Sequence, residues 1–176
     1  RGGLCFVSTK RYCKANNQFV KDYDKTKPTT YISYVDMNNL YGCAMREMMP
    51  YKNFSWCNEI EIDTILNTSD DSKVGYTVEC DIEVPKDKQD YYMDFPMLPE
   101  NMEIKYDMLC DYNKSRVKTG YVSNKLVPTL FDKVKFTLDY RLLKTAVKFG
   151  YKVKKIYRCV KYNQKAFIKE YIDKNT

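Results

Sequence analysis

The sequence predicts an α+β fold in which helices pack on an antiparallel sheet. Several short segments alternate apolar and polar residues, as half-buried strands do, and other segments repeat apolar residues at helical spacing. With 176 residues, of which 44% are hydrophobic, the chain can bury a sizeable core as one domain. It contains no run of about 18 apolar residues, so we expect no membrane partner.

The first predicted strand covers residues 31–35 and stops at Asp36. β-Branched and aromatic residues alternate there, and Tyr34 and Val35 are predicted core residues. A helix is predicted next, ended by Pro50, because apolar residues recur at helical spacing: Leu40, Tyr41, Ala44, Met45, Met48 and Met49. A lone Asp at a strand end is also typical of a turn or a helix cap, so the spacing alone leaves the role of Asp36 open.

The remaining elements follow the same two periodicities. The predicted strands are residues 74–85, 125–130, 133–139 and 151–162. The predicted helices are residues 106–116, 140–149 and 164–174, the second ended by Gly150. Residues 86–104 contain two prolines and little periodicity, which predicts a long loop.

Cysteine and histidine usage restricts the available chemistry. The seven cysteines are widely spaced and form no C-x-x-C pair, which indicates reduced thiols and an intracellular protein. The chain has no histidine, which excludes zinc sites of Cys and His, Ser-His-Asp triads and Cys-His nucleophiles within it. Catalysis must therefore rest on carboxylates, hydroxyls, amines or metal ions held by oxygen.

Charge is distributed unevenly along the chain. Residues 1–111 hold 13 basic and 19 acidic side chains, a net charge of −6, whereas residues 112–176 hold 17 and 4, a net charge of +13. Tyrosines are interleaved with the lysines and arginines of the second part. Ammonium groups neutralise phosphates and aromatic rings stack on bases, so this part suits a nucleic acid; a solvated basic face is the alternative.

The segment DMNNLYG at residues 36–42 resembles motif A of family B DNA polymerases, D-x-x-S-L-Y-P, with Asn39 in the Ser place and Gly42 in the Pro place. The flanks extend the resemblance. Arg1, Gly2 and Gly3 resemble the end of the Tyr-x-Gly-Gly element of protein-primed members, and AMREMMPYKNF at residues 44–54 is similar to the helix and Pro-Tyr turn that follow motif A there.

The resemblance covers nearly all of the chain and implies part of a polymerase palm, with an antiparallel sheet, packed helices and an inserted subdomain. Residues 1–58 would hold the Gly-Gly element and motif A, residues 59–132 a palm strand and insertion, and residues 133–176 a basic strand-helix-strand-helix segment. Because the chain starts at Arg1 and not at Met, we expect both ends to lie within a longer polypeptide. Relatives of this kind occur in viruses, linear plasmids and transposons.

The resemblance also implies roles for single residues. Asp36 would be the catalytic carboxylate and, with the carbonyl of Met37, a ligand of two Mg²⁺ ions about 4 Å apart that carry out nucleotidyl transfer. The triphosphate and sugar would contact Met37, Asn39, Leu40 and Tyr41, with Tyr41 excluding a 2′-hydroxyl. The implied partners are a DNA primer-template, deoxynucleoside triphosphates and a terminal priming protein.

DNA contacts are predicted at the N-terminus and on the last strand. The first group is Arg1, Gly2 and Gly3. The second is Lys152, Lys154 and Arg158, which share one face of a period-2 strand.

Two further polymerase motifs have no match in the sequence. These are the Lys-x-x-x-Asn-Ser-x-Tyr-Gly helix and the Asp-Thr-Asp turn, which supplies the second metal-binding carboxylate. We therefore expect the chain alone to be inactive and its parent to be a DNA-directed DNA polymerase. The alternatives are a basic module that binds single-stranded nucleic acid, or a metal-dependent nuclease that combines Asp36 with Asp81 or Asp111. Asp81, Glu83, Asp107 and Asp111 are otherwise expected to be surface or loop residues.

Overall fold

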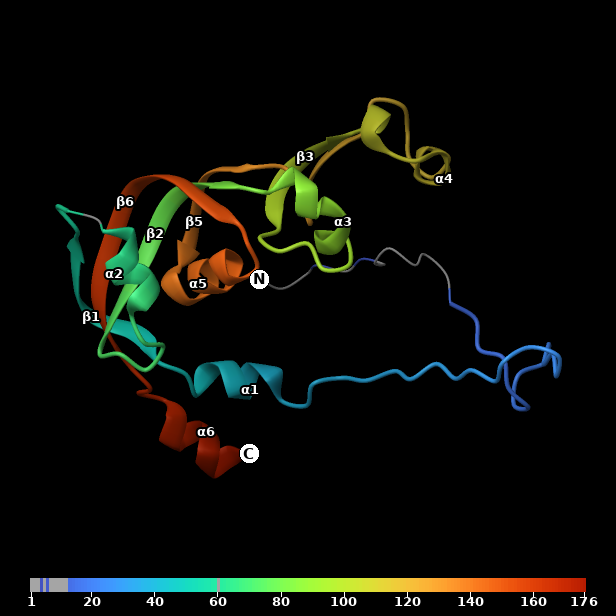
Figure 1. The fold of residues 1–176 in the computed structure, drawn as a ribbon, viewed down its shortest axis with the longest axis horizontal. Coiled ribbons are helices and arrows are strands. Elements are labelled where there is room, and N and C mark those ends of the chain that lie inside the picture. Colours follow the sequence, from blue (N-terminus) through green and yellow to red (C-terminus); the bar gives the residue numbers. More distant parts are fainter. Residues whose placement is uncertain (1–3, 5, 7–12, 60) are drawn as a thin grey trace. The chain divides into compact units, whose positions relative to one another are not determined.

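The fold is α+β, as predicted, with a curled antiparallel sheet and several helices (Figure 1). The structure is a computed structural model that describes residues 4, 6, 13–59 and 61–176. Arg1, Gly2 and Gly3 therefore lie outside the described residues. The strands of the four-stranded sheet, in spatial order, are β1 (Met49–Trp56), β6 (Lys152–Lys165), β2 (Val74–Glu83) and β5 (Lys133–Asp139).

The chain divides into two compact units. One contains Arg1–Ser8 and Val78–Tyr157, and the other contains Thr9–Thr77 and Arg158–Thr176. Strands β2 and β6 contribute residues to both units. None of the described helices is long and apolar enough to cross a lipid bilayer.

In the first unit, β2 forms the centre of the core. Its alternate side chains Val78, Cys80 and Ile82 are at most 1% exposed, which confirms the strand predicted from their spacing. Burial raises the pKa of the Cys80 thiol to about 11, so this cysteine is protonated and unreactive at neutral pH. The strand prediction for β5 is also confirmed, at the predicted bounds.

Helix α5 (Tyr140–Lys148) follows β5 directly, as predicted. The Asp139 carboxylate accepts a hydrogen bond of 2.9 Å from the Arg141 backbone N–H and so caps the first turn. Tyr140, Leu143 and Ala146 form the buried stripe of the helix. Gly150 ends it with a φ of 98°, a conformation that glycine adopts without steric cost.

Residues 86–105 are more ordered than the sequence predicts, whereas the helix predicted over residues 106–116 is divided into two short helices. The loop expected over residues 86–104 is wrong, because the chain there forms two short helices and a strand. Residues 86–127 contain the 3₁₀-helices Lys86–Lys88 and Tyr106–Met108, the α-helices α3 (Gln89–Tyr92) and α4 (Asp111–Lys114), and the strands β3 (Glu100–Lys105) and β4 (Val122–Val127). Strands β3 and β4 pair antiparallel in continuous register, and this pairing, not local sequence, determines the strand.

The second unit contains β1, the C-terminal part of β6 and three helices: α1 (Leu40–Met45), α2 (Ile62–Asn67) and α6 (Lys169–Asn175). The helix expected to run to Pro50 ends at Met45, and Pro50 lies inside β1. Proline is tolerated there because β1 is an edge strand of the sheet. The buried Tyr162 of β6 donates a hydrogen bond of 3.1 Å to the Tyr76 carbonyl.

A buried ion pair connects β3 to the start of β5. The Lys133 side chain is 0% exposed, and its Nζ lies 2.7 Å from Glu100 Oε1. It also donates to the hydroxyl and the carbonyl of Thr129. Burial alone would raise the pKa of Glu100, but the hydrogen bonds from Lys133 and Thr129 hold it below its usual value.

We expect Glu100→Ala to lower the free energy of unfolding by roughly 2–4 kcal/mol, because it leaves a buried ammonium group without its carboxylate. Glu103→Ala on the same strand is the control. Its partner Lys105 lies 3.5 Å away and both side chains are mostly exposed, so the loss should be under about 1 kcal/mol. Urea denaturation measures both, and equal losses would contradict a structural role for the buried pair.

Candidate functional site

Asp36 lies at the end of an extended stretch that forms no strand. Residues 31–37 pair with no strand among the described residues, so the strand predicted over residues 31–35 is wrong. The Asp36 side chain is exposed, and its Oδ1 accepts a hydrogen bond of 2.9 Å from the Met37 backbone N–H. The carboxylate is therefore accessible and sits directly before the turn into α1.

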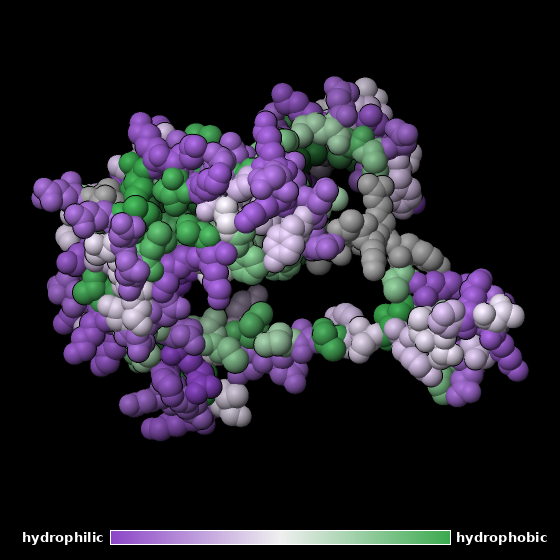
Figure 2. Space-filling view, in the orientation of Figure 1, coloured by the Kyte–Doolittle hydropathy of each residue, from purple (hydrophilic) through white to green (hydrophobic). Residues whose placement is uncertain are grey.

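The side chains of this stretch are exposed, in contrast to the predicted core positions. Tyr34 is 93% and Val35 is 83% exposed, so the core prediction for both residues is wrong. Figure 2 shows apolar residues at the surface along this stretch. Alternation of side chains predicts a strand only where a neighbouring strand supplies hydrogen bonds and cover, and none of the described residues does so here.

Asn39 begins helix α1 and closes the turn after Asp36. Its φ is 53°, a left-handed conformation that asparagine adopts more readily than most residues. Its side-chain oxygen accepts a hydrogen bond of 3.2 Å from the Gly42 backbone N–H. A Cβ atom on Gly42 would lie 2.4 Å from that side chain, so the cap requires glycine at this position.

The other predicted nucleotide-binding residues surround this cap and are exposed. Met37 is 69%, Leu40 is 58% and Tyr41 is 83% exposed. The amides of Leu40 and Tyr41 occupy the first two helical positions, where a helix offers no internal acceptor. The Asn39 side-chain amide, in contrast, lies 3.2 Å from the Thr176 hydroxyl.

Helix α6 holds α1 through contacts that the sequence did not predict. Arg46, at the end of α1, lies 2.7 Å from the carboxylate of Asp173. Hydrogen bonding from Lys169, together with the nearby Arg46 charge, lowers the pKa of Asp173. No local pattern relates residues so far apart in the chain, which is why Arg46, Asp173 and Thr176 were missed.

The predicted DNA-binding face of β6 already has partners. Lys152 and Lys154 lie 3.3 and 2.8 Å from the Glu83 carboxylate. Hydrogen bonds from these two lysines lower the pKa of Glu83. The Arg158 guanidinium lies over the Trp56 ring, 5.8 Å from its centroid. All three basic side chains are exposed, so each can still reach an anion.

The other candidate carboxylates show no metal site. Asp81 accepts hydrogen bonds of 2.8 Å from the Lys135 N–H and from the Tyr157 hydroxyl, and these bonds lower its pKa. Asp107 and Asp111 lie in the short helices after β3. Within the described part of the chain, no three Asp, Glu, Cys or His side chains come close enough to share a metal ion.

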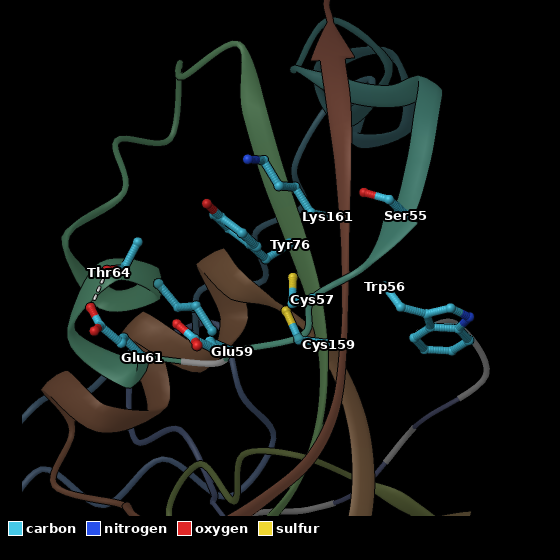
Figure 3. Close-up of a pocket in the computed structure, with 10 residues that line it drawn as sticks. Ser55, Trp56, Cys57, Glu59, Glu61, Thr64, Tyr76, Cys159 and Lys161 are labelled. Atoms are coloured by element: carbon cyan, nitrogen blue, oxygen red, sulfur yellow. Dashed lines mark hydrogen bonds between the residues drawn. The ribbon is translucent and has the colours of Figure 1, made fainter.

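A polar pocket of about 410 Å³ lies beside β6 (Figure 3). Glu59, Glu61 and Lys161 line it together with the thiols of Cys57 and Cys159. Burial is the main cause that raises the pKa of Cys159, so its thiol is a poor nucleophile. We assign this pocket no reaction.

The family model for DNA polymerase type B, organellar and viral, matches residues 15–176. The chain belongs to this family. No curated protein and no solved structure shows a significant similarity to it. The matched range includes Asp36 and α1, which carried the resemblance to motif A, but it does not include Arg1, Gly2 and Gly3.

The structure shows that the two residues that differ from the resembled motif, Asn39 and Gly42, depend on each other. A proline in the place of Gly42 would have no N–H to donate a hydrogen bond to the Asn39 side-chain oxygen. A serine in the place of Asn39 would be smaller and would leave room for a Cβ atom on residue 42. Asn39 and Gly42 thus form a matched pair that closes the turn.

We expect Gly42→Ala to destabilise α1 in the native chain, because the added Cβ displaces the Asn39 cap. In an Asn39→Gly background the same substitution should stabilise α1 by up to about 1 kcal/mol, since alanine favours helix more than glycine does. Hydrogen exchange at the Cys43 amide, which bonds the Asn39 carbonyl, measures both. The same sign of effect in both backgrounds would show that the two positions are independent.

Proposed function

We propose that the chain supplies the motif A part of a DNA polymerase palm and that Asp36 is its catalytic metal ligand. One observation carries the proposal: the family match spans the segment in which an exposed Asp36 stands immediately before the capped helix α1. The reaction is template-directed addition of deoxynucleotides to a primer. In this reaction the primer hydroxyl attacks the α-phosphate and pyrophosphate leaves.

The donors at this position suit Mg²⁺. The Asp36 carboxylate and the Met37 carbonyl are hard oxygen ligands, which Mg²⁺ prefers. When bound, a pair of metal ions would lower the pKa of the primer hydroxyl and neutralise charge on the leaving pyrophosphate. The described residues supply one such carboxylate and not a cluster, so we assign the second to another part of the parent polymerase.

The start of α1 would orient the incoming nucleotide. The N–H groups of Leu40 and Tyr41 are donors for phosphate oxygens, as first-turn amides are in other helices. The exposed ring of Tyr41 has room to lie beneath the sugar and exclude a 2′-hydroxyl. Asn39 would act through the backbone turn that it caps, since both ends of its side chain already have partners.

The exposed stretch before Asp36 also fits a palm. Tyr31, Ile32, Tyr34 and Val35 present alternating apolar side chains and an extended backbone. We infer that a strand carrying the second carboxylate pairs with this stretch in the parent. Such pairing would bury the apolar side chains, satisfy the backbone and bring the two carboxylates together.

The basic strand β6 would follow the DNA backbone. Lys152, Lys154 and Arg158 would neutralise phosphates, and DNA would compete with Glu83 for the two lysines. We assign Arg1, Gly2 and Gly3 to the same primer-template path on the resemblance alone. A terminal priming protein is the further partner that the protein-primed branch implies.

We expect Asp36→Asn in the parent polymerase to lower nucleotide addition by a factor on the order of 10³ or more, because it removes a metal-binding charge at nearly constant volume. DNA affinity should change little. Glu47→Gln is the matched control, since it removes an exposed carboxylate close to the other end of α1. A primer-extension assay separates the two, and wild-type rates from Asp36→Asn would disprove the proposal.

We expect Tyr41→Ala to lower the preference for deoxyribonucleotides over ribonucleotides by roughly 10- to 100-fold, because it opens the space beneath the 2′ position. Tyr91→Ala is the control, as this tyrosine is also exposed but lies on α3, away from the Asp36 segment in the chain. Single-nucleotide incorporation with both sugar types gives the ratio. An unchanged ratio for Tyr41→Ala would leave the residue with no part in sugar selection.

A further inference from the structure

Two aromatic side chains stand exposed on the edge strand β1. Trp56 is 64% and Phe54 is 60% exposed. They line an open hollow of about 210 Å³ together with Ser55 of β1 and Val160 of the adjacent strand β6. A cavity of about 150 Å³ is enough to hold benzene, so this hollow has room for a nucleobase ring.

Irregular pairing of β1 with β6 produces this arrangement. The register shifts between Pro50 and Lys52 and again between Lys52 and Ser55. Asn53 lies within the second shift and has a φ of 58°. Each shift inserts one extra residue into β1, and such bulges re-aim the side chains that follow. Phe54 follows Asn53 directly, and both its ring and that of Trp56 line the same hollow.

The aromatic face has a firm support. The Phe54 ring packs on the buried Tyr162 ring at a centroid distance of 5.8 Å. The Tyr162 hydroxyl is fixed by its hydrogen bond to the Tyr76 carbonyl. Arg158, Val160 and Tyr162 alternate along β6 and so lie on the same side of the strand. The Phe54 ring therefore stands on buried structure, and Trp56 contacts Arg158 on the same side of β6.

The strands that form the face carry positive charge. Strands β1 and β6 contain no Asp or Glu, and the residues of the second unit on them include Lys52, Arg158 and Lys165. A fourth basic residue, Lys161, lies on the opposite side of β6 from Arg158 and lines the polar pocket. The Arg158 guanidinium lies over the Trp56 ring. Trp56 also borders the polar pocket, whose lining includes the acids Glu59 and Glu61 (Figure 3).

We propose that Trp56 and Phe54 form a stacking platform for the unpaired bases of single-stranded DNA, with Arg158 and Lys52 contacting the phosphates. Exposed rings beside cations are the combination that such binding requires, because every base offers a π-face and every nucleotide a phosphate. Base pairing would remove those faces, so the platform prefers single strands to duplex. The proposal does not depend on Asp36 or on catalysis.

Trp56 is the only tryptophan of the chain, so its fluorescence reports directly on the platform. The 176-residue chain is titrated with a short oligothymidylate, with an abasic oligomer of equal length and with a duplex. The oligothymidylate should quench the fluorescence and bind more tightly than either of the others. Equal quenching by the abasic oligomer, or tighter binding and stronger quenching by the duplex, would overturn the proposal.

Variants test whether the rings carry the affinity, which is measured by anisotropy of a labelled oligothymidylate. Trp56→Leu should weaken binding by roughly 5- to 100-fold, whereas Trp56→Phe, which keeps a ring, should retain most of it. Neither should alter binding of the abasic oligomer. Tyr91→Leu is the matched control, because Tyr91 is also 64% exposed but lies on α3.

Circular dichroism shows whether Trp56→Leu folds. If it does not, Phe54→Leu takes its place and should weaken binding of the oligothymidylate in the same range, while Trp56→Phe remains the variant that keeps a ring. Native affinity in a folded Trp56→Leu or Phe54→Leu chain, or an equal loss in Tyr91→Leu, would refute the platform.

Discussion

Alternate burial along β2 is the constraint on which most of the first unit depends. Val78, Cys80 and Ile82 place their side chains in the core, and burial of each large apolar side chain contributes about 1.5–3 kcal/mol. The polar residues between them are used as well. Asp81 bonds the Lys135 amide and the Tyr157 hydroxyl, and Glu83 pairs with two lysines of β6. One strand therefore supplies both the core and the contacts that hold its neighbours in place.

The parts of the fold that the sequence predicted are those with a strong local signal. Apolar and polar residues alternate along the sequence of β2, and burial follows this alternation from Val78 to Glu83. Helix α5 has both a capping Asp139 and a terminal Gly150. Strands β1 and β3 were not predicted from the sequence. Strand β1 forms by pairing with β6 and β3 by pairing with β4, and pairing with a distant segment produces no periodic pattern in a short sequence. Helix α2 was missed because only one of its residues, Ile65, is buried.

The candidate site shows the same division. The Asp36 segment could be found from seven consecutive residues, because the residues that carry its resemblance to motif A are adjacent in the chain. The surroundings of Asp36 could not be predicted from the sequence, because the exposed stretch before it was mistaken for a core strand. The contacts of α6 with α1 depend on tertiary structure. The Asn39 cap was visible only in the structure, where it also explains why position 42 is glycine.

The position of the metal ion tests the role of Asp36 most directly. In the parent polymerase bound to primer-template and nucleotide, Fe²⁺ can replace Mg²⁺, and peroxide with ascorbate then generates hydroxyl radicals that cut the backbone next to the metal. Mass spectrometry should locate the cuts between Asp36 and Tyr41, and Asp36→Asn should abolish them. Cuts elsewhere in the chain, with none in this segment, would contradict the assignment of Asp36 as a metal ligand.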